Sequence, residues 1–142
     1  MTAMPFDARP LAPTASASSA ARWTGRVLSG IAVLFLLFDA TFKLFATAEA
    51  LAGSPDLGWS LRQLPTLAAI QLACLALYPV PRTAPLGAVL WTGYLGGAIA
   101  THLRLDNPLF SHVLFPIYVA ALIWGGLYLR DARVRALLRP AR

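Results

Sequence analysis

The stretch LLFDATFKLF, residues 36–45, decides how this chain must fold. Asp39 and Lys43 interrupt a run of leucine and phenylalanine, and they stand four residues apart. On a helix this spacing places both side chains on one side, close enough to pair. Charges within so apolar a segment are costly unless they find partners. The stretch therefore predicts a helix whose charged side faces other parts of the protein.

The composition around this stretch is too apolar for a small soluble domain. Of 142 residues, 58% are hydrophobic and 13% are charged, whereas about 25% are charged in an average globular protein. A domain of this size leaves much of its surface exposed. The excess apolar surface needs a second apolar medium, and we expect that medium to be a lipid bilayer.

Four apolar segments predict an all-α fold, a bundle of four transmembrane helices running up-down-up-down. Backbone groups find no partners in lipid, which favours helices, and the runs are too long for strands. The expected helices cover residues of about 27–48, 64–80, 85–101 and 109–129. They make one membrane domain, residues 23–132, between a flexible tail at 1–22 and a basic tail at 133–142.

The arginines gather outside the apolar runs, which indicates orientation in a membrane rather than binding to nucleic acid. The formal net charge is +6, and most of it falls on one side of the predicted bundle. Those residues are Arg9, Arg22, Arg26, Arg82, Arg130, Arg133, Arg135, Arg139 and Arg142. The positive-inside rule then places both termini in the cytoplasm and the chain in a bacterial inner membrane.

Both ends of the membrane domain allow an alternative interpretation. Residues 27–38 and the ATAEA at 46–50 resemble a cleaved signal peptide. The charges of Asp39 and Lys43 between them, and the long preceding tail, favour a retained helix. The segment DARVRALLRPAR, 131–142, is either the cytoplasmic anchor of the last helix or a basic helix lying on anionic lipid.

The polar residues predict a pocket near the outer membrane face. With a rise of about 1.5 Å per residue, Asp39 and Lys43 lie beyond the membrane midplane. The turn between the third and fourth helices lies at that same face, because helices joined by a short loop are neighbours. The candidate pocket residues are Asp39, Lys43, His102, Arg104, Asp106 and His112. Alternatively, Lys43 extends to the lipid headgroups and Asp39 is a structural partner only.

Small residues on the last two helices predict close helix packing, within the bundle or in a homo-oligomer. They are Gly93, Gly96, Gly97, Gly125 and Gly126. Pro116 falls inside the predicted fourth helix, where it predicts a kink. Gln71, the lone polar residue in the middle of the second helix, predicts a hydrogen bond to another helix.

No pattern in the sequence predicts a metal or a cofactor held by the chain itself. His102 and His112 have the spacing of neither a zinc site nor a c-type haem motif. The sequence has no phosphate-binding glycine loop, no serine nucleophile elbow and no paired cysteines. These observations favour a protein that is not an enzyme as an isolated chain.

The segment GYLGGAIATHLRLDNPLFSHVLFPIYVAALIWGGLYLR, 93–130, resembles the DoxX-like membrane proteins. The shared residues are Gly96, Gly97, His102, Arg104, Pro108, His112, Phe115, Pro116, Trp124, Gly125, Gly126 and Arg130. Asp39 and Lys43 also suit the family, and the resemblance covers roughly residues 25–135. It implies a four-helix membrane bundle. It also implies a link to quinones, since the family takes its name from a small subunit associated with thiosulfate:quinone oxidoreduction, while other relatives are assembly factors.

Three functions stay open at this point. The first is a small membrane subunit of a quinone-linked redox system, with a partner protein that carries the electrons. Histidine exchanges protons near neutral pH, which suits quinone chemistry. The second is a non-enzymatic binding or assembly factor. The third is a transporter of protons or small molecules, although four helices leave little room for alternating access.

Overall fold

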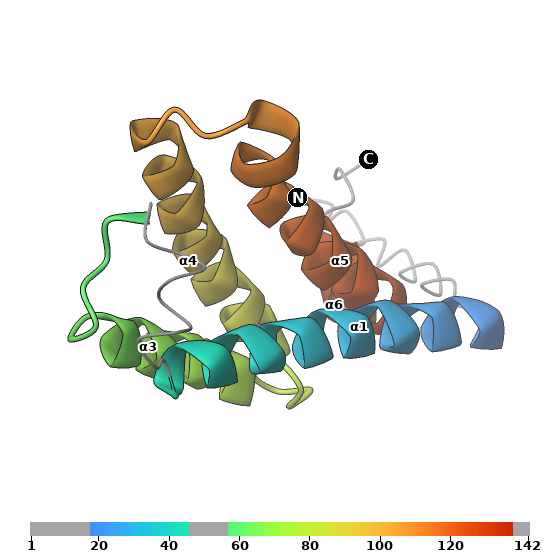
Figure 1. Ribbon diagram of the computed structural model, residues 1–142. Helices are drawn as coiled ribbons and strands as arrows, with labels where there is room; N and C mark the ends of the chain where they lie inside the picture. Colours follow the sequence, from blue (N-terminus) through green and yellow to red (C-terminus); the bar gives the residue numbers. More distant parts are fainter. Residues whose placement is uncertain (1–17, 46–56, 138–142) are drawn as a thin grey trace, which may run out of the picture.

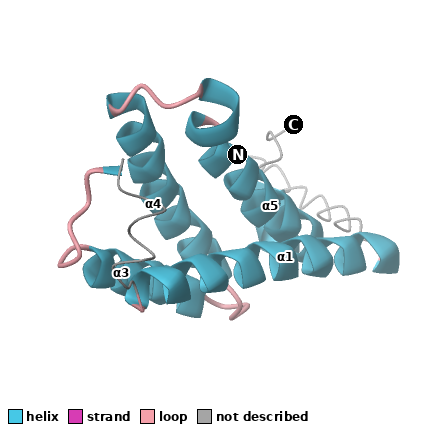
Figure 2. Ribbon diagram, in the orientation of Figure 1, coloured by secondary structure: helices cyan, strands magenta, loops and turns pink. Residues whose placement is uncertain are grey.

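The computed structural model describes residues 18–45 and 57–137, and within these ranges every regular element is helical (Figures 1 and 2). The predicted all-α class is therefore confirmed for this part of the chain. The elements are α1 (Ser19–Leu44), α3 (Leu64–Leu77), α4 (Ala84–Arg104), the π-helical turn η2 (Leu109–Val113), α5 (Phe115–Arg130) and α6 (Ala132–Leu137).

The helix bounds differ from the prediction mainly at the two ends of the chain. α1 begins at Ser19, ahead of the expected start near Val27. The Ser18 hydroxyl caps it by accepting a hydrogen bond from the Ala21 N–H at 3.1 Å. The rest of the predicted flexible tail, 1–17, lies outside the described residues, as does the predicted end of the first helix at 46–48. Part of the predicted basic tail forms α6.

The four long helices are arranged in a ring. Each packs against its neighbours along the chain, and α1 closes the ring by packing against α5. In Figure 1, α4 and α5 stand side by side, joined at the top by the segment that contains η2, while α1 runs across their lower ends. This arrangement leaves the upper end of α4 apart from α1.

α1 buries mainly small residues and exposes most of its large apolar residues. The buried residues are Gly25, Ser29, Ala32, Leu36 and Ala40. The opposite faces expose large side chains, with Leu34 at 68% and Phe38 at 70% of their surface accessible. A soluble helix has the reverse pattern. Large apolar groups on the outside suit a helix that is surrounded by lipid.

The closest contact in the ring lies between α1 and α5. A Cβ atom on Gly126 would come within 2.6 Å of the Ser29 Oγ and 3.0 Å of the Gly25 carbonyl oxygen. A Cβ atom on Gly25 would come within 2.7 Å of the Gly126 carbonyl oxygen. Facing glycines thus let the two backbones touch, the kind of contact that stabilises helix pairs in membranes.

Tyr78, just after α3, joins three helices beside this contact. Its hydroxyl donates to the Ile123 carbonyl at 2.7 Å and lies 2.9 Å from the Ser29 hydroxyl. The Arg130 guanidinium donates to the Tyr78 carbonyl at 3.0 Å and lies over its ring. Tyr78 is 1% exposed, so these bonds satisfy its polar groups where water does not reach.

Two helices of the described chain are long and apolar enough to cross a membrane. They are Ser19–Leu44 and the combined segment Leu109–Arg130. α3 is apolar but has 14 residues, which at about 1.5 Å each fall short of a hydrocarbon layer of about 30 Å. α4 has 21 residues but carries glycine, threonine, histidine and arginine. The predicted crossing of the membrane by all four helices is thus not established by length and composition.

The predicted fourth helix bends at Leu114, two residues before Pro116. Pro116 stands in the first turn of α5, where proline is favoured because its missing N–H would have no partner there. The segment before it, Leu109–Val113, forms the separate π-helical turn η2. The apolar run Leu109–Arg130 is therefore interrupted at Leu114, and Pro116 lies at the start of its second part.

Asp131 ends α5 and caps α6. Its carboxylate accepts bonds from the Arg133 backbone N–H at 2.9 Å and from the Arg133 guanidinium at 2.7 Å. These bonds lower the pKa of Asp131 below its ordinary range, and burial opposes them only in part. The capped turn folds α6 back, so that Val134 is buried against the core.

The α1–α5 contact predicts different outcomes for adjacent glycines. Gly126→Ala should destabilise the protein by about 1–3 kcal/mol, because its Cβ overlaps backbone atoms of α1. Gly125→Ala is the matched control, since a Cβ there meets nothing within 4 Å. It should leave stability unchanged or slightly raised. Thermal unfolding in detergent measures both, and equal losses would contradict the contact.

Asp131 predicts a stability change in acid. A carboxyl whose pKa is lower in the folded state stabilises that state above its ordinary pKa, about 3.9. This contribution is lost as the pH falls through the lowered value. Wild type should therefore exceed Asp131→Asn in unfolding temperature at pH 7, and the gap should shrink as the pH falls below about 4. A gap independent of pH between 7 and 3 would contradict the assignment.

Candidate functional site

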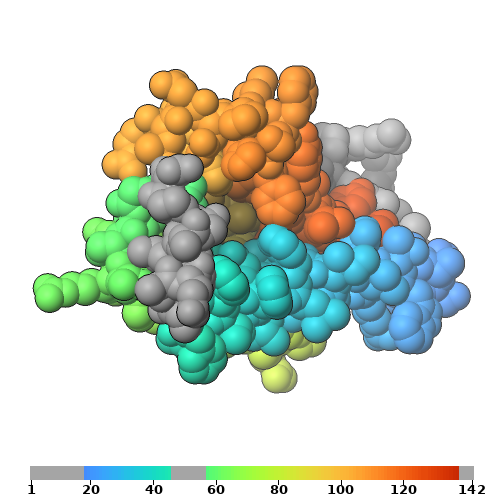
Figure 3. Space-filling model, viewed as in Figure 1, coloured from blue at the N-terminus to red at the C-terminus, as the bar shows by residue number. Residues whose placement is uncertain are grey.

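A cavity of about 750 Å³ lies between α1, α3, α4 and the start of α5. The space-filling view shows a recess between α1 and α5, with α4 at its floor (Figure 3). Most of the lining is apolar, and its polar side chains include Asp39, Lys43, Tyr94, Thr101 and His102. An apolar cavity of this size with a few polar groups is typical of a site for a small organic molecule.

The ion pair of the opening sequence lies at this cavity. The Lys43 ammonium donates to Asp39 Oδ2, one helical turn away on α1. The Lys43 side chain is 22% exposed and the Asp39 side chain 36% exposed, and both line the cavity. The pair therefore lines the cavity, and the Lys43 ammonium bonds to Asp39 and Gln71 within the bundle.

Gln71 of α3 holds the ion pair in place. Its amide nitrogen donates to Asp39 Oδ2 at 2.8 Å and to the Leu36 carbonyl at 3.0 Å. Its amide oxygen accepts from the Lys43 ammonium at 3.2 Å and from the Tyr94 hydroxyl at 2.9 Å. Gln71 is fully buried, and all its hydrogen-bonding capacity is used. This arrangement fixes which end of the amide faces which partner.

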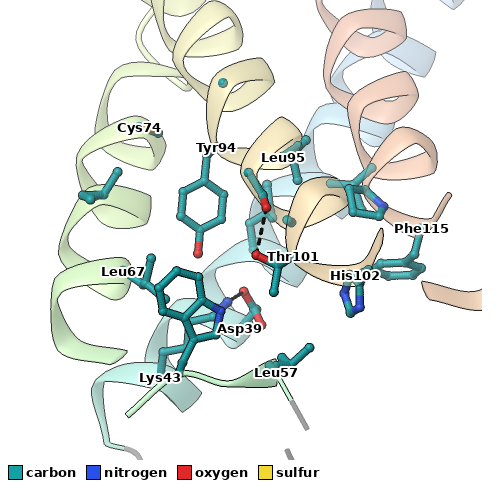
Figure 4. Close-up of a pocket in the computed structure, with 18 of the residues that line it drawn as sticks. Asp39, Lys43, Leu57, Leu67, Cys74, Tyr94, Leu95, Thr101, His102 and Phe115 are labelled. Atoms are coloured by element: carbon teal, nitrogen blue, oxygen red, sulfur yellow. Dashed lines mark hydrogen bonds and ion pairs between the residues drawn. The ribbon is translucent and has the colours of Figure 1, made fainter. Parts of the chain in front are cut away.

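Tyr94 joins α4 to the same cluster. In Figure 4 its hydroxyl points toward Asp39 and Lys43 across the cavity. The Lys43 ammonium also lies 5.9 Å from the centre of the Tyr94 ring, within the range of a cation–π contact. Asp39, Lys43, Gln71 and Tyr94, referred to below as the tetrad, therefore connect α1, α3 and α4 at one point.

His102 is the member of the predicted outer-face group that shares the cavity with the ion pair. It lines the opposite side, near Phe115 (Figure 4). Its Nδ1 atom lies 2.9 Å from the Asn107 side-chain amide. The Asn107 amide nitrogen donates there, so Nδ1 is an acceptor and the proton of a neutral ring is on Nε2.

The other predicted pocket residues lie around the turn after α4, outside the cavity lining. Asp106 is exposed and has a φ of 51°, so its backbone forms the left-handed turn that ends α4. The Arg104 guanidinium lies beside Gly58. His112 is exposed, bonds the Ser111 hydroxyl at 2.8 Å and contacts the His102 ring edge-on at 5.6 Å. Of the six residues predicted to form one layer, three line the cavity and three do not. Those outside the lining are Arg104, Asp106 and His112.

The glycines predicted to pack have two different surroundings. Gly126 contacts α1, as described above. A Cβ on Gly93, Gly96, Gly97 or Gly125 would meet nothing within 4 Å, so the close packing predicted for these four is absent from this structure. Gly93 and Gly97 instead line the cavity. Small side chains leave space beside a helix, and no other described part of the chain fills the space beside these four glycines.

Sequence reasoning missed Tyr94. The available signal was helical spacing, because Gly93, Gly97 and Thr101 repeat every four residues and Tyr94 lies next to that line. All four residues line the cavity. Gln71 was predicted to bond another helix, but its partners were not identified, because nothing in the sequence of α3 sets its rotation relative to α1.

Comparison with known proteins gives a family and no closer relative. The sequence profile of the DoxX-like family matches residues 27–126, well over half of the chain. The matched range begins within α1 and extends to Gly126 in α5, so it includes the tetrad and the cavity. No curated protein and no solved structure matches the chain.

The hydrogen bonds of Gln71 predict a graded loss of stability. Gln71→Leu keeps the volume but removes bonds to Lys43, Asp39, Tyr94 and Leu36, and should cost about 2–4 kcal/mol. Tyr94→Phe removes one bond and should cost about 1 kcal/mol. Thermal unfolding in detergent gives both values. Losses in the reverse order would show that Gln71 does not hold the cluster.

Proposed function

Since the chain belongs to the DoxX-like family, we propose that it is a small membrane subunit that binds a lipid-soluble quinone for a redox partner protein. Family membership and the two long apolar helices indicate a membrane protein. The proposal adds a ligand and a partner. The observation that carries it is an apolar cavity of about 750 Å³ with Asp39, Lys43 and Tyr94 in its wall, which Gln71 holds in place from behind.

The chemistry of the cavity suits a quinone. The Lys43 ammonium has three protons, of which Asp39 and Gln71 take two. The third is available to a carbonyl oxygen of the ligand. His102 in the form described above adds an N–H donor across the cavity. The apolar lining suits the ring and the first part of an isoprenoid tail, and Lys43 and His102 would orient the head group.

We further propose that all four long helices lie across a bacterial inner membrane, with both termini in the cytoplasm. α3 would then need flanking residues to complete its crossing. The basic residues of α6 and of the turn before α4 support this orientation. The cavity would then lie toward the outer membrane face, open to acyl chains beside Phe35 and Phe115, whose rings touch edge-on at 5.4 Å.

A second candidate is a non-enzymatic assembly factor. It is favoured by the outer surface of α4, where Gly96 has open space and Leu86 and Leu103 are more than half exposed. A helix of another membrane protein could pack closely there. Photo-crosslinking from position 96 would recover one protein repeatedly under this second function. Crosslinks to lipid alone would remove it.

Quinone binding can be tested with a pair of glycine variants. Purified protein in nanodiscs should bind decylubiquinone, seen as a rise in unfolding temperature and quenching of tryptophan fluorescence. Gly93→Leu places a side chain in the cavity and should weaken binding at least tenfold. Gly96→Leu, three residues along on the same helix, points into open space outside the cavity lining and should bind as wild type does.

Two outcomes would contradict the proposal. One is no change in fluorescence or unfolding temperature at decylubiquinone concentrations that saturate the nanodisc lipid. The other is binding that both leucine variants weaken equally, because the ligand would then lie elsewhere on the protein or in the lipid.

A further inference from the structure

The tetrad has unused hydrogen-bonding capacity, and most of it accepts rather than donates. Asp39 Oδ2 accepts from Lys43 and Gln71, while Asp39 Oδ1 has no partner among the described residues. The Tyr94 hydroxyl gives its proton to Gln71, so its oxygen is left as an acceptor. Lys43 has one proton left over after its bonds to the described residues. The wall therefore offers a carboxylate oxygen, a phenol oxygen and one ammonium N–H.

We infer that the cavity selects a neutral amphiphile whose head group donates a hydrogen bond as well as accepting one. A hydroxyl group does both: its proton goes to Asp39 Oδ1 and its oxygen accepts from Lys43. A carbonyl or an ether only accepts, and leaves the carboxylate oxygen unsatisfied in an apolar cavity. For a quinone couple, the preferred ligand is the reduced, dihydroxy form. This last step rests on the proposed function, but the selection of a hydroxyl does not.

The charge of the cluster favours a neutral ligand. Asp39 and Lys43 compensate each other, so the wall carries no net charge from this pair. A carboxylate or phosphate head would compete with Asp39 for Lys43 and leave one anion without a partner. In an apolar cavity an unpaired charge is strongly disfavoured. Fatty acids and phospholipid headgroups are therefore poor ligands by this argument.

The cluster is held rigid before any ligand arrives. Gln71 is fully buried and bonds four groups, among them the backbone carbonyl of Leu36. Rotating its amide would place an N–H against Lys43 and an oxygen against Asp39, which is unfavourable on both sides. Asp39 Oδ1 and the free Lys43 proton consequently keep their places. Groups fixed in advance discriminate between ligands more strongly than mobile ones.

The lining beyond the tetrad defines the rest of the ligand. Leu67, Val89, Leu95 and Val119 are among the apolar side chains that face the cavity. They suit a hydrocarbon portion and offer no further charged group. A molecule with one hydroxyl-bearing ring and an alkyl tail thus matches both parts of the cavity.

The test compares two redox-inert ligands that differ in one hydrogen-bond donor. 4-Nonylphenol donates and accepts, whereas its methyl ether only accepts. Equilibrium binding to the protein in nanodiscs, corrected for partition into empty nanodiscs, should favour the phenol by about ten- to hundredfold. That is the range expected for a hydrogen bond to a charged group. Decylubiquinol should likewise bind more tightly than decylubiquinone.

Two variants test which residue makes the protein prefer the phenol over its methyl ether. Asp39→Asn removes the carboxylate and should reduce the preference for the phenol to a few-fold or less. Thr101 lines the same cavity, and its hydroxyl bonds to the Gly97 carbonyl instead of to the tetrad. Thr101→Val should therefore keep the preference. If Asp39→Asn does not fold, Asp39→Glu keeps the charge but moves the carboxylate by one methylene group, and it should lower the preference while leaving binding of the ether unchanged.

The outcomes separate the inference from the proposed function. If decylubiquinone and decylubiquinol bind equally and the phenol has no advantage over its ether, the inference is overturned while quinone binding stands. Tighter binding of the ether overturns it as well. If the phenol is preferred but neither form of the quinone binds, hydroxyl selection holds and the proposed function fails. If no probe binds, both are wrong.

Discussion

The hydrogen bonds of Gln71 are the constraint on which the arrangement of the helices depends. An ion pair on α1 needs further partners in an apolar environment, and a single buried amide supplies them from α3 while it also bonds Tyr94 of α4. Moving any of these three helices by a fraction of a turn would break at least one bond. Polar contacts of this kind specify a single packing, whereas apolar contacts alone tolerate several.

The two ends of α1 are held to the other helices by different kinds of contact. At one end, Gly25 and Gly126 bring α1 and α5 into backbone contact, and the bonds of Tyr78 fasten α3 to them. At the other end, the small residues of α4 have no neighbour to pack against. There the tetrad fixes the helices at a distance and the cavity remains between them. Close packing at one end of α1 and polar contacts at its other end leave the cavity open between the helices.

The site follows from this division of roles. Asp39, Lys43 and Tyr94, which help to hold the helices, also form part of the polar wall of the cavity. Substitutions of these residues therefore change the contacts between helices and the cavity wall together. Gly93 and Gly97 of α4 line the cavity without bonding to the tetrad, so side chains introduced there would change the cavity and leave the hydrogen bonds between the helices in place.

The sequence by itself determined the all-helical class, the family and the pairing of Asp39 with Lys43. Each depends on local spacing or on composition, which a single chain displays directly. Only the tertiary structure decided that Tyr94 completes the cluster, that Pro116 begins a helix, and that Gly93 and Gly97 face a cavity while Gly126 faces α1. These features depend on how far each helix is rotated about its axis, and that rotation is set by bonds between segments distant in sequence.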